Sequence, residues 1–569
     1  MGKALVTLIN PNLVHPPVTP YALDILTTSL EADDFDVDVV DLTFERHDWR
    51  SVLARYFARR SPLLVGVTVR NTDTIYAQQQ RVFLGDHKEI IEAVKEGTAA
   101  PIIAGGVGFS SMPFALVDYF DIPFGVKGPG EHLVVRLANT LLDGGRPDEI
   151  PGLIVNHGDG RVERITGGRP LESRRGQRAK VDIGVVPINV TTGYTRRSGV
   201  PMKVDNLRYY REGGLGNILT KNGCTFACAH CVEPDAKGTS FTRRAVDAVV
   251  DEIESLVAQG VRDLHTTDSE FNLLVAHSKA VLSEIVRRKE RDRHSPLHEL
   301  RLWVYAQPTP FDEELMALLA AAGCAGINLA PDHVREEMLD DWKVTARGSR
   351  YYRFADAEAV CGMAASYGLP VMVEVLLGMP GETEETLREA VRRTLALGVT
   401  VVGYSLGIRA FPHSPLGIRL AERCAGTRTV PGLQSDTART PIVLRPQGSV
   451  STVEYERQFV FDETGRFRPV YYLSPELPEP ESTLSSPNGR WLNTIRLLWD
   501  LVPERDRHRV MLPTVEGLTP DDDNFADNPF LVQAVRLGYT GAFWSHWPRR
   551  EEVMRGIRKV ELAGRRPGE

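Results

Sequence analysis

The sequence contains few cysteines and no long apolar run. Only six of its 569 residues are cysteine, and three of these lie in one short segment, which leaves no framework of disulfide bonds. Such a composition is typical of a chain that folds in a reducing compartment, so we expect a cytoplasmic protein. No apolar stretch reaches the roughly 18 residues of a membrane-spanning helix. The first residues form a buried-strand pattern without a signal-peptide cleavage site.

The chain also lacks an excess of positive charge. Its formal net charge is −8, and acidic and basic residues are mixed along the sequence. Because nucleic-acid binding needs a basic surface, we expect neither a nucleic acid nor a membrane as a partner. Hydrophobic residues make up 42% of the chain, which is enough for packed cores. At roughly 150 residues per domain, the length predicts three or four domains.

Three cysteines form the most informative pattern in the chain. Cys224, Cys228 and Cys231 have the spacing C-x3-C-x2-C. Thiolates this close together on one loop can each bind a different iron of a cubane cluster. Four cysteines satisfy every iron of a [4Fe-4S] cluster, whereas three leave the fourth iron open. An open iron can bind the amino and carboxylate groups of S-adenosylmethionine (SAM).

A zinc site is the alternative interpretation of this segment. Cys228, His230 and Cys231 could supply half of such a site, because Cys and His at these spacings bind zinc. The chain would then be a zinc-stabilised binding module without catalytic activity. The other cysteines stand singly in apolar surroundings and are typical of small core residues: Cys324, Cys361 and Cys424.

Residues 1–145 alternate between strand and helix patterns. Strands are predicted over 4–9, 37–42, 63–69 and 102–104, and helices over 21–30, 49–59, 79–95 and 131–142. The alternation predicts a doubly wound parallel sheet, whose ligands lie beyond the carboxyl ends of the strands. Candidate binding residues gather in loops at those ends: Thr19, Tyr21, Arg70, Asn71, Thr72, Gly105, Gly106, Gly108, Ser110, Ser111, Gly128, Pro129, Gly130 and Glu131. A sheet domain without a ligand would carry similar loops.

Three further regions follow. Residues 146–215 are predicted to be a connector with a hairpin around His157-Gly158-Asp159-Gly160 and a solvated basic stretch over 173–178. Residues 216–420 are predicted to form a partial (β/α)6 barrel, with strands over 217–221, 263–267, 300–305, 326–329, 371–377 and 401–406. Active groups of barrels lie at the carboxyl ends of the strands. Residues 421–569 are expected to form a mixed C-terminal domain that caps the substrate. We expect a helix over 491–501, and an aromatic end over 539–547 that is either core or a lid for a flat, apolar substrate.

The cluster segment and two turns resemble the cobalamin-dependent radical SAM methyltransferases. The turns are G-M-P-G-E-T-E-E at 378–385 and F-P-H-S-P-L at 411–416, and the likeness covers residues 1–420. The resemblance implies a Rossmann-like cobalamin-binding domain before the barrel. It implies a [4Fe-4S] cluster, cobalamin and SAM as cofactors, and an external electron donor that reduces cobalamin. It also implies cofactor contacts at Phe226, His230, Asn272, Gln307, Glu374 and Gly378, with His230 where the family usually has an aromatic residue against the adenine.

Arg70 is the candidate residue beneath the corrin ring. Many cobalamin domains carry D-x-H-x-x-G, whose histidine binds cobalt from below, and this motif is absent here. A guanidinium stays protonated and has no lone pair for a metal. Arg70 would therefore favour four-coordinate cobalt(I), a strong nucleophile. The alternative is an arginine that simply pairs with Asp73.

Glu270 and Tyr305 are the other candidate catalytic residues. Glu270, in D-S-E-F-N, could occupy the open iron or hold the amino group of SAM; ligation would suppress radical formation and leave SAM as a methyl donor. The alternative is a surface carboxylate near a helix start. Tyr305 ends a predicted strand and could act as a general base, or it is a core tyrosine with a satisfied hydroxyl.

Within this family the likeness is strongest to enzymes that methylate carbon 2 of L-tryptophan in antibiotic biosynthesis. It rests on H-P-P-V-T-P-Y-A-L-D at 15–24, R-N-T-D at 70–73 and D-S-E-F-N at 268–272. It implies that methylcobalamin passes its methyl group to the indole, whose sp2 carbon attacks without prior hydrogen abstraction. The alternative within enzymes is a radical methylase or ring-modifying enzyme that acts on an unactivated carbon and makes 5′-deoxyadenosine.

Overall fold

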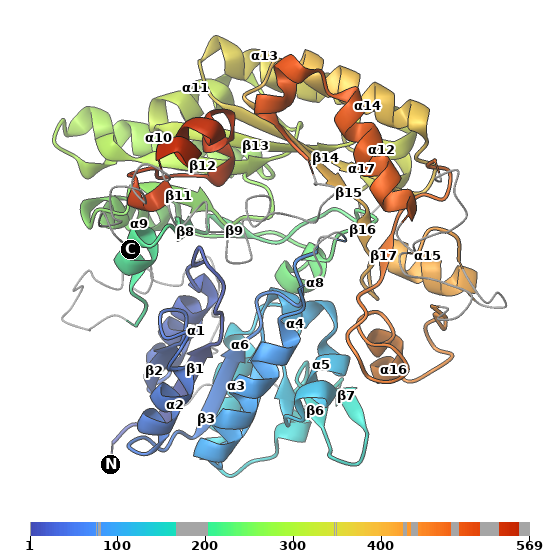
Figure 1. Cartoon of the computed structure of the whole chain (residues 1–569). Helices are drawn as coiled ribbons and strands as arrows, with labels where there is room; N and C mark the ends of the chain where they lie inside the picture. The colour runs from blue at the N-terminus through green and yellow to red at the C-terminus, as the bar shows by residue number, and fades with distance from the viewer. Residues whose placement is uncertain are drawn as a thin grey trace, which may run out of the picture.

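The chain forms two seven-stranded sheets, one below the other in Figure 1. The structure, a computed structural model, describes residues 2–75, 77, 81–166, 203–345, 348, 350–424, 430–433, 442–478, 489–512 and 534–556. Helices α4 (Val107–Ser111) and α8 (Glu233–Lys237) lie between the two sheets and contact each other. Within these ranges, no helix has both the length and the apolar character needed to cross a bilayer.

The first sheet is doubly wound, as the sequence predicts. Its order is β2-β1-β3-β4-β5-β6-β7, and the first five of these strands run parallel. They are β1 (Leu5–Asn10), β2 (Asp36–Asp41), β3 (Leu64–Thr68), β4 (Ile102–Gly105) and β5 (Phe124–Gly125). Helices α1 (Tyr21–Ala32) and α6 (Glu131–Leu142) cover one face, while α2 (Trp49–Phe57), α3 (Leu84–Gly97) and α5 (Pro113–Phe120) cover the other. The strands are apolar on both faces because both are buried.

The predicted connector contributes two strands to this sheet. Its hairpin is β6 (Ile154–Asn156) and β7 (Val162–Arg164), and β6 pairs antiparallel with β5. The hairpin prediction is confirmed, and the sheet of the first domain continues past residue 145. The basic stretch over 173–178 lies outside the described residues. Helix α7 (Asn206–Arg211) leads into the second sheet.

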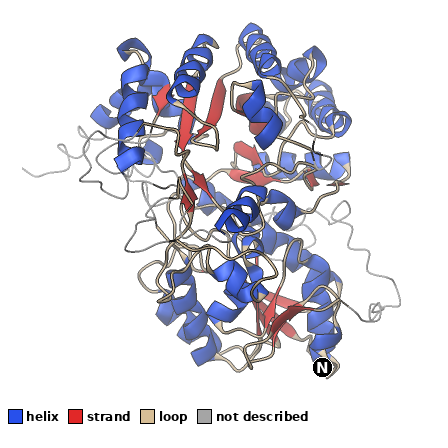
Figure 2. Ribbon diagram, turned by 90° about the vertical axis from the view of Figure 1, so that its right-hand side faces the viewer, coloured by secondary structure: helices blue, strands red, loops and turns tan. Residues whose placement is uncertain are grey.

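The second sheet is the predicted open barrel. Its order is β18-β15-β14-β13-β12-β11-β8, with parallel neighbours throughout. The strands are β8 (Gly216–Ile218), β11 (Asp263–Thr266), β12 (Arg301–Ala306), β13 (Cys324–Asp332), β14 (Val371–Leu377), β15 (Val401–Leu406) and β18 (Val510–Met511). The helices around it are α9 (Val246–Ala258), α10 (Val275–Arg291), α11 (Glu313–Ala322), α13 (Phe354–Ser366), α14 (Glu384–Ala396) and α17 (Gly489–Leu501), and Figure 2 shows them outside the strands. The fold class is confirmed; β18, from the C-terminal region, is an addition.

Side chains alternate along each barrel strand between the outer helices and the interior. On β12, Leu302 and Val304 join the outer core, while Trp303 belongs to a separate inner cluster. The aromatic end of the chain, η4 (Phe543–Arg549), completes that cluster: the rings of Trp544 and Trp303 meet edge to face with centroids 5.6 Å apart.

This aromatic segment is the floor of the barrel. A side chain on Gly326 of β13 would lie 2.7 Å from both tryptophan rings, so the glycine makes room for them. Trp547 donates its indole N–H to the carbonyl of Val510, at 2.9 Å. The rings of Phe543, Trp544 and Trp547 are therefore packed as core, and the capping role expected for the C-terminal segment stays a prediction.

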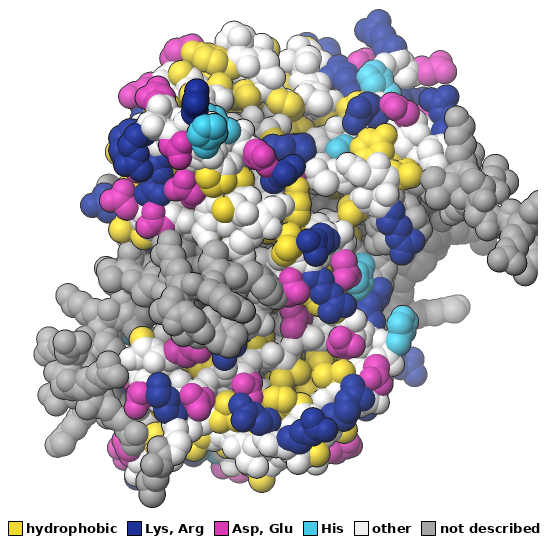
Figure 3. Space-filling view, turned by 90° about the vertical axis from the view of Figure 1, so that its left-hand side faces the viewer, with side chains coloured by type: hydrophobic (Ala, Val, Ile, Leu, Met, Phe, Trp, Pro, Cys, Tyr) yellow, Lys and Arg dark blue, Asp and Glu magenta, His cyan; other side chains and the backbone are white. Residues whose placement is uncertain are grey.

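Charges of both signs cover the surface. In Figure 3, lysine, arginine, aspartate and glutamate side chains are interspersed over the described part of the face in view. One example is Arg288 of α10, which forms ion pairs with Asp251 and Glu254 of α9 at 2.7 and 3.0 Å.

Candidate active site

The three cysteines lie together in the loop after β9 (Lys221–Asn222). Cys224 and Cys228 are buried beside Phe226, and Cys231 packs against the same cluster. Glycine is required at 223: its φ is 103°, and a side chain there would lie 2.1 Å from the carbonyl of Ser240.

Backbone contacts hold this loop from the far side of the barrel. The amides of Ala227 and Ala229 donate to the carbonyls of Val344 and Trp342, both at 2.9 Å. Among the described residues, no group of three or more His, Cys, Asp or Glu side chains is arranged to hold a single metal ion. The three thiols of this loop suit a cluster in which each sulfur binds its own iron.

A buried cation stands beside the thiols. Burial raises the pKa of Cys228 to about 12, and it raises the pKa values of Cys224 and Cys231 as well. Lys343 lowers the pKa of Cys228, and its ammonium lies 3.0 Å from Asp332, at the end of β13. Because metal binding needs thiolates, this lysine supplies positive charge where negative sulfur must form. Sequence reasoning missed Lys343 and Asp332, since a lone lysine has no diagnostic spacing.

Glu270 reaches the same place. Its Oε2 is buried without a hydrogen-bond partner, while its Oε1 accepts from the side-chain amide of Gln307. Burial raises the pKa of Glu270 to about 7, while the positive charge of Lys343 lowers it. The negative charge of Glu270 in turn raises the pKa of Cys224. An orphaned buried carboxylate oxygen beside three thiols fits an iron ligand or an acceptor for the amino group of SAM.

Asn272 positions Gln307 from below. Its side chain donates to the carbonyls of Gln307 and Pro310, both at 2.8 Å, and accepts from the amide of Gln307 at 2.9 Å. The amide group of Asn272 is therefore bound to protein on both sides, whereas Oε1 of Gln307 is buried without a partner. Of these two predicted cofactor contacts, Gln307 is the one whose side chain keeps an oxygen available for a hydrogen bond to a ligand.

Tyr305 and Glu374 meet inside the barrel. Tyr305, on β12, donates its hydroxyl to Oε2 of Glu374, on β14. Burial raises the pKa of Glu374 to about 7. The ring of His265, on β11, lies with its centroid 6.4 Å from that of Tyr305. The tyrosine hydroxyl is bonded, but to an acidic group inside the barrel and not to the backbone.

The loop after β4 carries the predicted glycines. Gly106 has φ 110°, and a side chain on it would lie 2.6 Å from the carbonyl of Val69, so only glycine fits. The hydroxyl of Ser110 accepts from the amide of Gly128 at 3.0 Å, which ties this loop to the one after β5. Gly105 ends β4, and Gly108 and Ser111 lie in α4, which follows it. Pro129 and Gly130 lie in the loop after β5, and Glu131 is buried at the start of α6.

The carboxyl end of the first sheet faces the cluster loop. Lys127 pairs with Asp235 of α8 at 2.7 Å. Tyr21 accepts a hydrogen bond from Arg244 at 2.8 Å, and the carbonyl of Thr19 accepts from Asn217 of β8 at 3.0 Å. Thr19 and Tyr21, predicted as cofactor contacts, thus also join the two halves.

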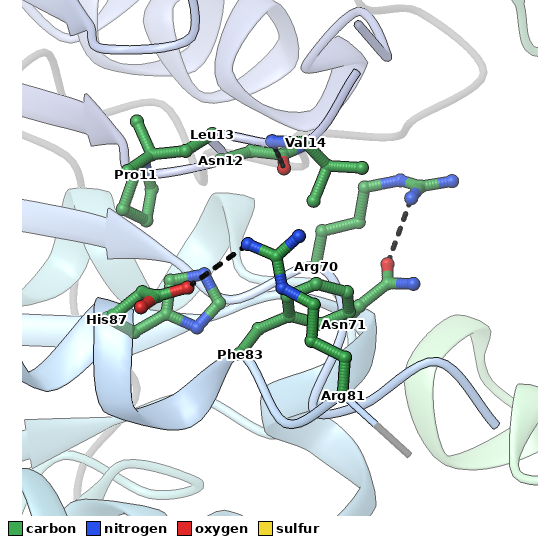
Figure 4. Close-up of a pocket in the computed structure, with 10 residues that line it drawn as sticks. Pro11, Asn12, Leu13, Val14, Arg70, Asn71, Arg81, Phe83 and His87 are labelled. Atoms are coloured by element: carbon green, nitrogen blue, oxygen red, sulfur yellow. Dashed lines mark hydrogen bonds and ion pairs between the residues drawn. The ribbon is translucent and has the colours of Figure 1, made fainter. Parts of the chain in front are cut away.

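Arg70 lies at the edge of a pocket below this junction (Figure 4). The pocket is lined by residues 11–14 after β1, by Arg70 and Asn71 after β3, and by Arg81, Phe83, Asp86 and His87. Nη1 of Arg70 donates to Oδ1 of Asn71 at 2.9 Å. Burial lowers the pKa of Arg70 to about 10, so the guanidinium stays charged at neutral pH.

Asp73 forms its ion pair with Arg409, whereas Arg70 was considered as its partner from the sequence. Its carboxylate forms a buried ion pair with Arg409 of β16 (Ile408–Arg409), at 3.0 Å, and accepts from the hydroxyl of Thr72 at 3.1 Å. Sequence reasoning missed Arg409, which lies 336 residues away. It also missed His87, whose Nδ1 is buried without a partner.

Three further residues were predicted to contact a cofactor: His230, Phe226 and Gly378. His230 is half-buried, its Nε2 lies 3.9 Å from Asp332, and burial lowers its pKa. Phe226 packs edge to face on Tyr351, with centroids 4.7 Å apart. Gly378 has φ 94° and follows β14, where its amide donates to Glu382 at 3.3 Å.

Comparison with known proteins places the chain among methyltransferases. A profile of the radical SAM superfamily matches residues 218–394. The chain is 55% identical to the tryptophan 2-C-methyltransferase of Streptomyces laurentii, with 98% of each chain covered.

Solved structures agree with this match. The radical S-adenosylmethionine methyltransferase TsrM from Kitasatospora setae, with cobalamin and a [4Fe-4S] cluster bound, has 55% identity and a TM-score of 0.89 over 98% of this chain and 100% of that one. Its complex with tryptophan substrate and the SAM analogue aza-SAM has a TM-score of 0.88 over the same shares. The chain therefore belongs to the cobalamin-dependent radical SAM methyltransferase family, in the group that contains tryptophan 2-C-methyltransferase.

Proposed function

We propose that this chain methylates carbon 2 of L-tryptophan with SAM and cobalamin. The single observation that carries the proposal is a loop of three cysteines, with the orphaned oxygen of Glu270 beside it, facing the glycine loops of a doubly wound sheet. Relatives with 55% identity over nearly the whole chain have this activity or bind tryptophan.

The cofactors have matching places. Cys224, Cys228 and Cys231 would hold the [4Fe-4S] cluster, and the loops after β1, β3, β4 and β5 would hold cobalamin. When bound, cobalamin supplies a carrier that takes the methyl group from SAM and gives it to the substrate. Arg70 offers hydrogen-bond donors and no lone pair beneath it. Glu270 and Gln307 offer acceptors toward the iron or the amino group of SAM.

A two-electron reaction suits these residues. Carbon 2 of indole is nucleophilic, so an electrophilic methyl group needs no hydrogen abstraction first. We assign Glu270 to the open iron or to the amino group of SAM, Arg70 to the lower face of the corrin, and Tyr305 to the proton that leaves carbon 2.

The proposal also covers the electron donor, the cellular location and the partners of the enzyme. Cobalamin acts in its reduced form, so an external electron donor is required. The six cysteines are free thiols and three would hold an oxygen-sensitive cluster, which supports a cytoplasmic location. Neither nucleic acid nor a membrane is part of the proposal, in keeping with the mixed charges in Figure 3.

The test is anaerobic incubation of the reconstituted enzyme with cobalamin, a reductant, L-tryptophan and SAM labelled in its methyl group. We expect labelled 2-methyltryptophan and one S-adenosylhomocysteine per product, without 5′-deoxyadenosine. A variant with Cys224, Cys228 and Cys231 replaced by alanine is the control and should form no product. Stoichiometric 5′-deoxyadenosine would instead indicate a radical methylase, and absence of methylated tryptophan would remove the substrate assignment.

A further inference from the structure

Tyr305 and Glu374 form an acid–base pair that spans a strand of the barrel. Tyr305 of β12 stands opposite Asn328 of β13 in register, and Glu374 of β14 stands opposite Gly403 of β15. Their neighbours Val304 and Val375 belong to the outer core, so strand alternation turns Tyr305 and Glu374 into the barrel. The hydroxyl of Tyr305 reaches across β13 to Oε2 of Glu374.

The pair of Tyr305 and Glu374 lies between the aromatic floor of the barrel and the end that carries the cysteine loop. Two residues before it on the same strands, Trp303 and Met372 pack on the aromatic floor. Two residues after Tyr305, Gln307 donates to Glu270 beside the cysteines. Both members of the pair are partly accessible to solvent and so line the interior space. A flat substrate between floor and cofactors would lie against them.

We propose that Glu374 is the final proton acceptor of the methylation and that Tyr305 passes the proton to it. The inference rests on the proposed function. The π electrons of the indole form the bond from carbon 2 to the methyl carbon, and the bond between methyl and carrier breaks with its electron pair left on the carrier. The C–H electrons of carbon 2 then return to the ring. Its proton goes to the oxygen of Tyr305, while the hydroxyl proton of Tyr305 goes to Oε2 of Glu374, which becomes neutral and later releases it to water.

A relay overcomes the weakness of a phenol as a base. A neutral phenol can accept a proton only if its own proton leaves at the same time, because its ordinary pKa is about 10. Glu374 provides that destination at hydrogen-bond distance, and burial raises its pKa to about 7, which suits a base working near neutral pH.

The groups that face the pair do not compete for this proton. Burial lowers the pKa of His265, on β11, to about 4, so its imidazole is neutral at neutral pH and a weak base. The residues opposite on β13 and β15 are Asn328 and Gly403, and the floor presents Trp303 and Trp544; none of these titrates. Three other acids belong to this part of the barrel. Asp263 accepts a hydrogen bond from the indole N–H of Trp303 at 2.9 Å, and Glu270 and Asp332 lie at the end that carries the cysteine loop, with Lys343.

The experiment compares Glu374→Gln and Tyr305→Phe with the wild-type enzyme. Glutamine keeps the shape and accepts the hydrogen bond of Tyr305, but it cannot take the proton. We expect kcat to fall about 10²- to 10⁴-fold, the range for a positioned acid or base, while KM for L-tryptophan changes less than about threefold because binding is retained. Formation of S-adenosylhomocysteine from SAM and reduced cobalamin, measured without tryptophan, should be unchanged.

Two further readouts separate a proton acceptor from a structural role. The wild-type rate should rise with pH through about 7, as Glu374 ionises, and Glu374→Gln should lose this limb. L-tryptophan deuterated at carbon 2 should show a larger isotope effect with Glu374→Gln, because loss of the proton becomes slower. Glu374→Asp should recover part of the rate.

The matched control is Glu456→Gln. Glu456 is also a buried glutamate, but it is bound to His413 at 2.7 Å outside the barrel interior; its replacement should leave kcat and the pH profile unchanged. A raised KM with unchanged kcat in Glu374→Gln would overturn the relay and assign Glu374 to the substrate ammonium. An unchanged pH limb and isotope effect would overturn it as well. Failure of the wild-type enzyme to methylate tryptophan would refute the proposed function itself and the relay with it.

Discussion

Glu270 and Gln307 present two buried oxygens without partners to the cysteine loop. An unsatisfied buried acceptor costs about 1–3 kcal/mol, so two of them at one place are a strain that a bound cation or donor would relieve. The other oxygen of Glu270 accepts from the side-chain amide of Gln307, whose backbone amide donates to Asn272. At the scale of single residues, the site is arranged for a positive or hydrogen-bond-donating group beside the cluster.

Replacing Glu270 by glutamine should change the electronic environment of the cluster. If the carboxylate binds the open iron, Mössbauer and electron paramagnetic resonance spectra of E270Q should show a different unique iron before SAM is added, and 5′-deoxyadenosine should begin to form. Glu456→Gln, at a buried glutamate that is paired with His413 at 2.7 Å, is the control. Identical iron spectra for E270Q and wild type would rule out ligation and leave the amino group of SAM as the partner.

Replacing Arg70 by histidine should add a lower ligand to cobalamin. The imidazole has a lone pair that the guanidinium lacks, so cobalt(II) spectra of R70H should show splitting from one axial nitrogen. The double variant R70H/H87Q should keep this splitting, which excludes His87, the other imidazole of the pocket, as its source. Unchanged coordination in R70H would place Arg70 away from the lower face.

The cluster loop is held in shape by a buried ion pair at the ends of two strands. Lys221 donates to Asp268 at 2.8 Å and to the carbonyl of Phe271 at 2.7 Å, and the side chains of the ion pair are 2% and 0% exposed. Asp268 also accepts from the amide of Thr220 at 2.8 Å. At the scale of elements, β9 and the turn after β11 are locked together, so the cysteines are pre-positioned before any iron binds.

Lys221→Met should destabilise the protein and loosen the cluster. It leaves the carboxylate of Asp268 buried without its cation, which costs about 3–5 kcal/mol. We expect a lower midpoint in urea unfolding and fewer irons retained per chain after reconstitution. The double variant K221M/D268N removes the orphaned charge and should recover part of the stability; equal loss in the single and double variants would contradict the ion-pair explanation.

Polar contacts join the two halves of the molecule beside an apolar core to which both halves contribute. Asp73 from the first domain pairs with Arg409 from the barrel, with side chains 0% and 2% exposed, and Arg457 pairs with Asp118 at 2.9 Å. A buried ion pair adds little net stability, but breaking it is costly because one charge is left buried without a partner. Such a pair therefore fixes the relative position of the two segments that carry it. At the scale of the whole molecule, it sets how the loop after β3 faces the barrel.

Arg409→Met should weaken cobalamin binding as well as the fold. The variant leaves Asp73 unpaired in the interface, at a cost of about 3–5 kcal/mol, and frees the loop that carries Arg70. We expect a higher Kd for cobalamin, measured by equilibrium dialysis with the intact protein. D73N/R409M should bind more tightly than R409M, whereas Arg457→Met, at a half-exposed pair, should change Kd little. An unchanged Kd for R409M would show that the interface does not order this loop.

The sequence by itself determined the elements that depend on local spacing. The cysteine loop, the alternating strands and helices, the barrel strands and the hairpin all follow from residues within a few turns of one another. The glycine at 106 could be expected too, because a positive φ is a local requirement. The short strands β5 and β18, each of two residues, carry too little pattern to be predicted.

Only the tertiary structure decided which distant side chains meet. Tyr305 finds Glu374 69 residues away, and Asp73 finds Arg409 rather than Arg70, because strand order and the contact between the two sheets bring them together. Lys343 gains its place beside the cysteines in the same way, and the aromatic end becomes the floor because Gly326 leaves room for it. Local spacing specifies what a loop can bind, whereas charge, proton transfer and the shape of the cavity depend on neighbours that only the packed chain supplies.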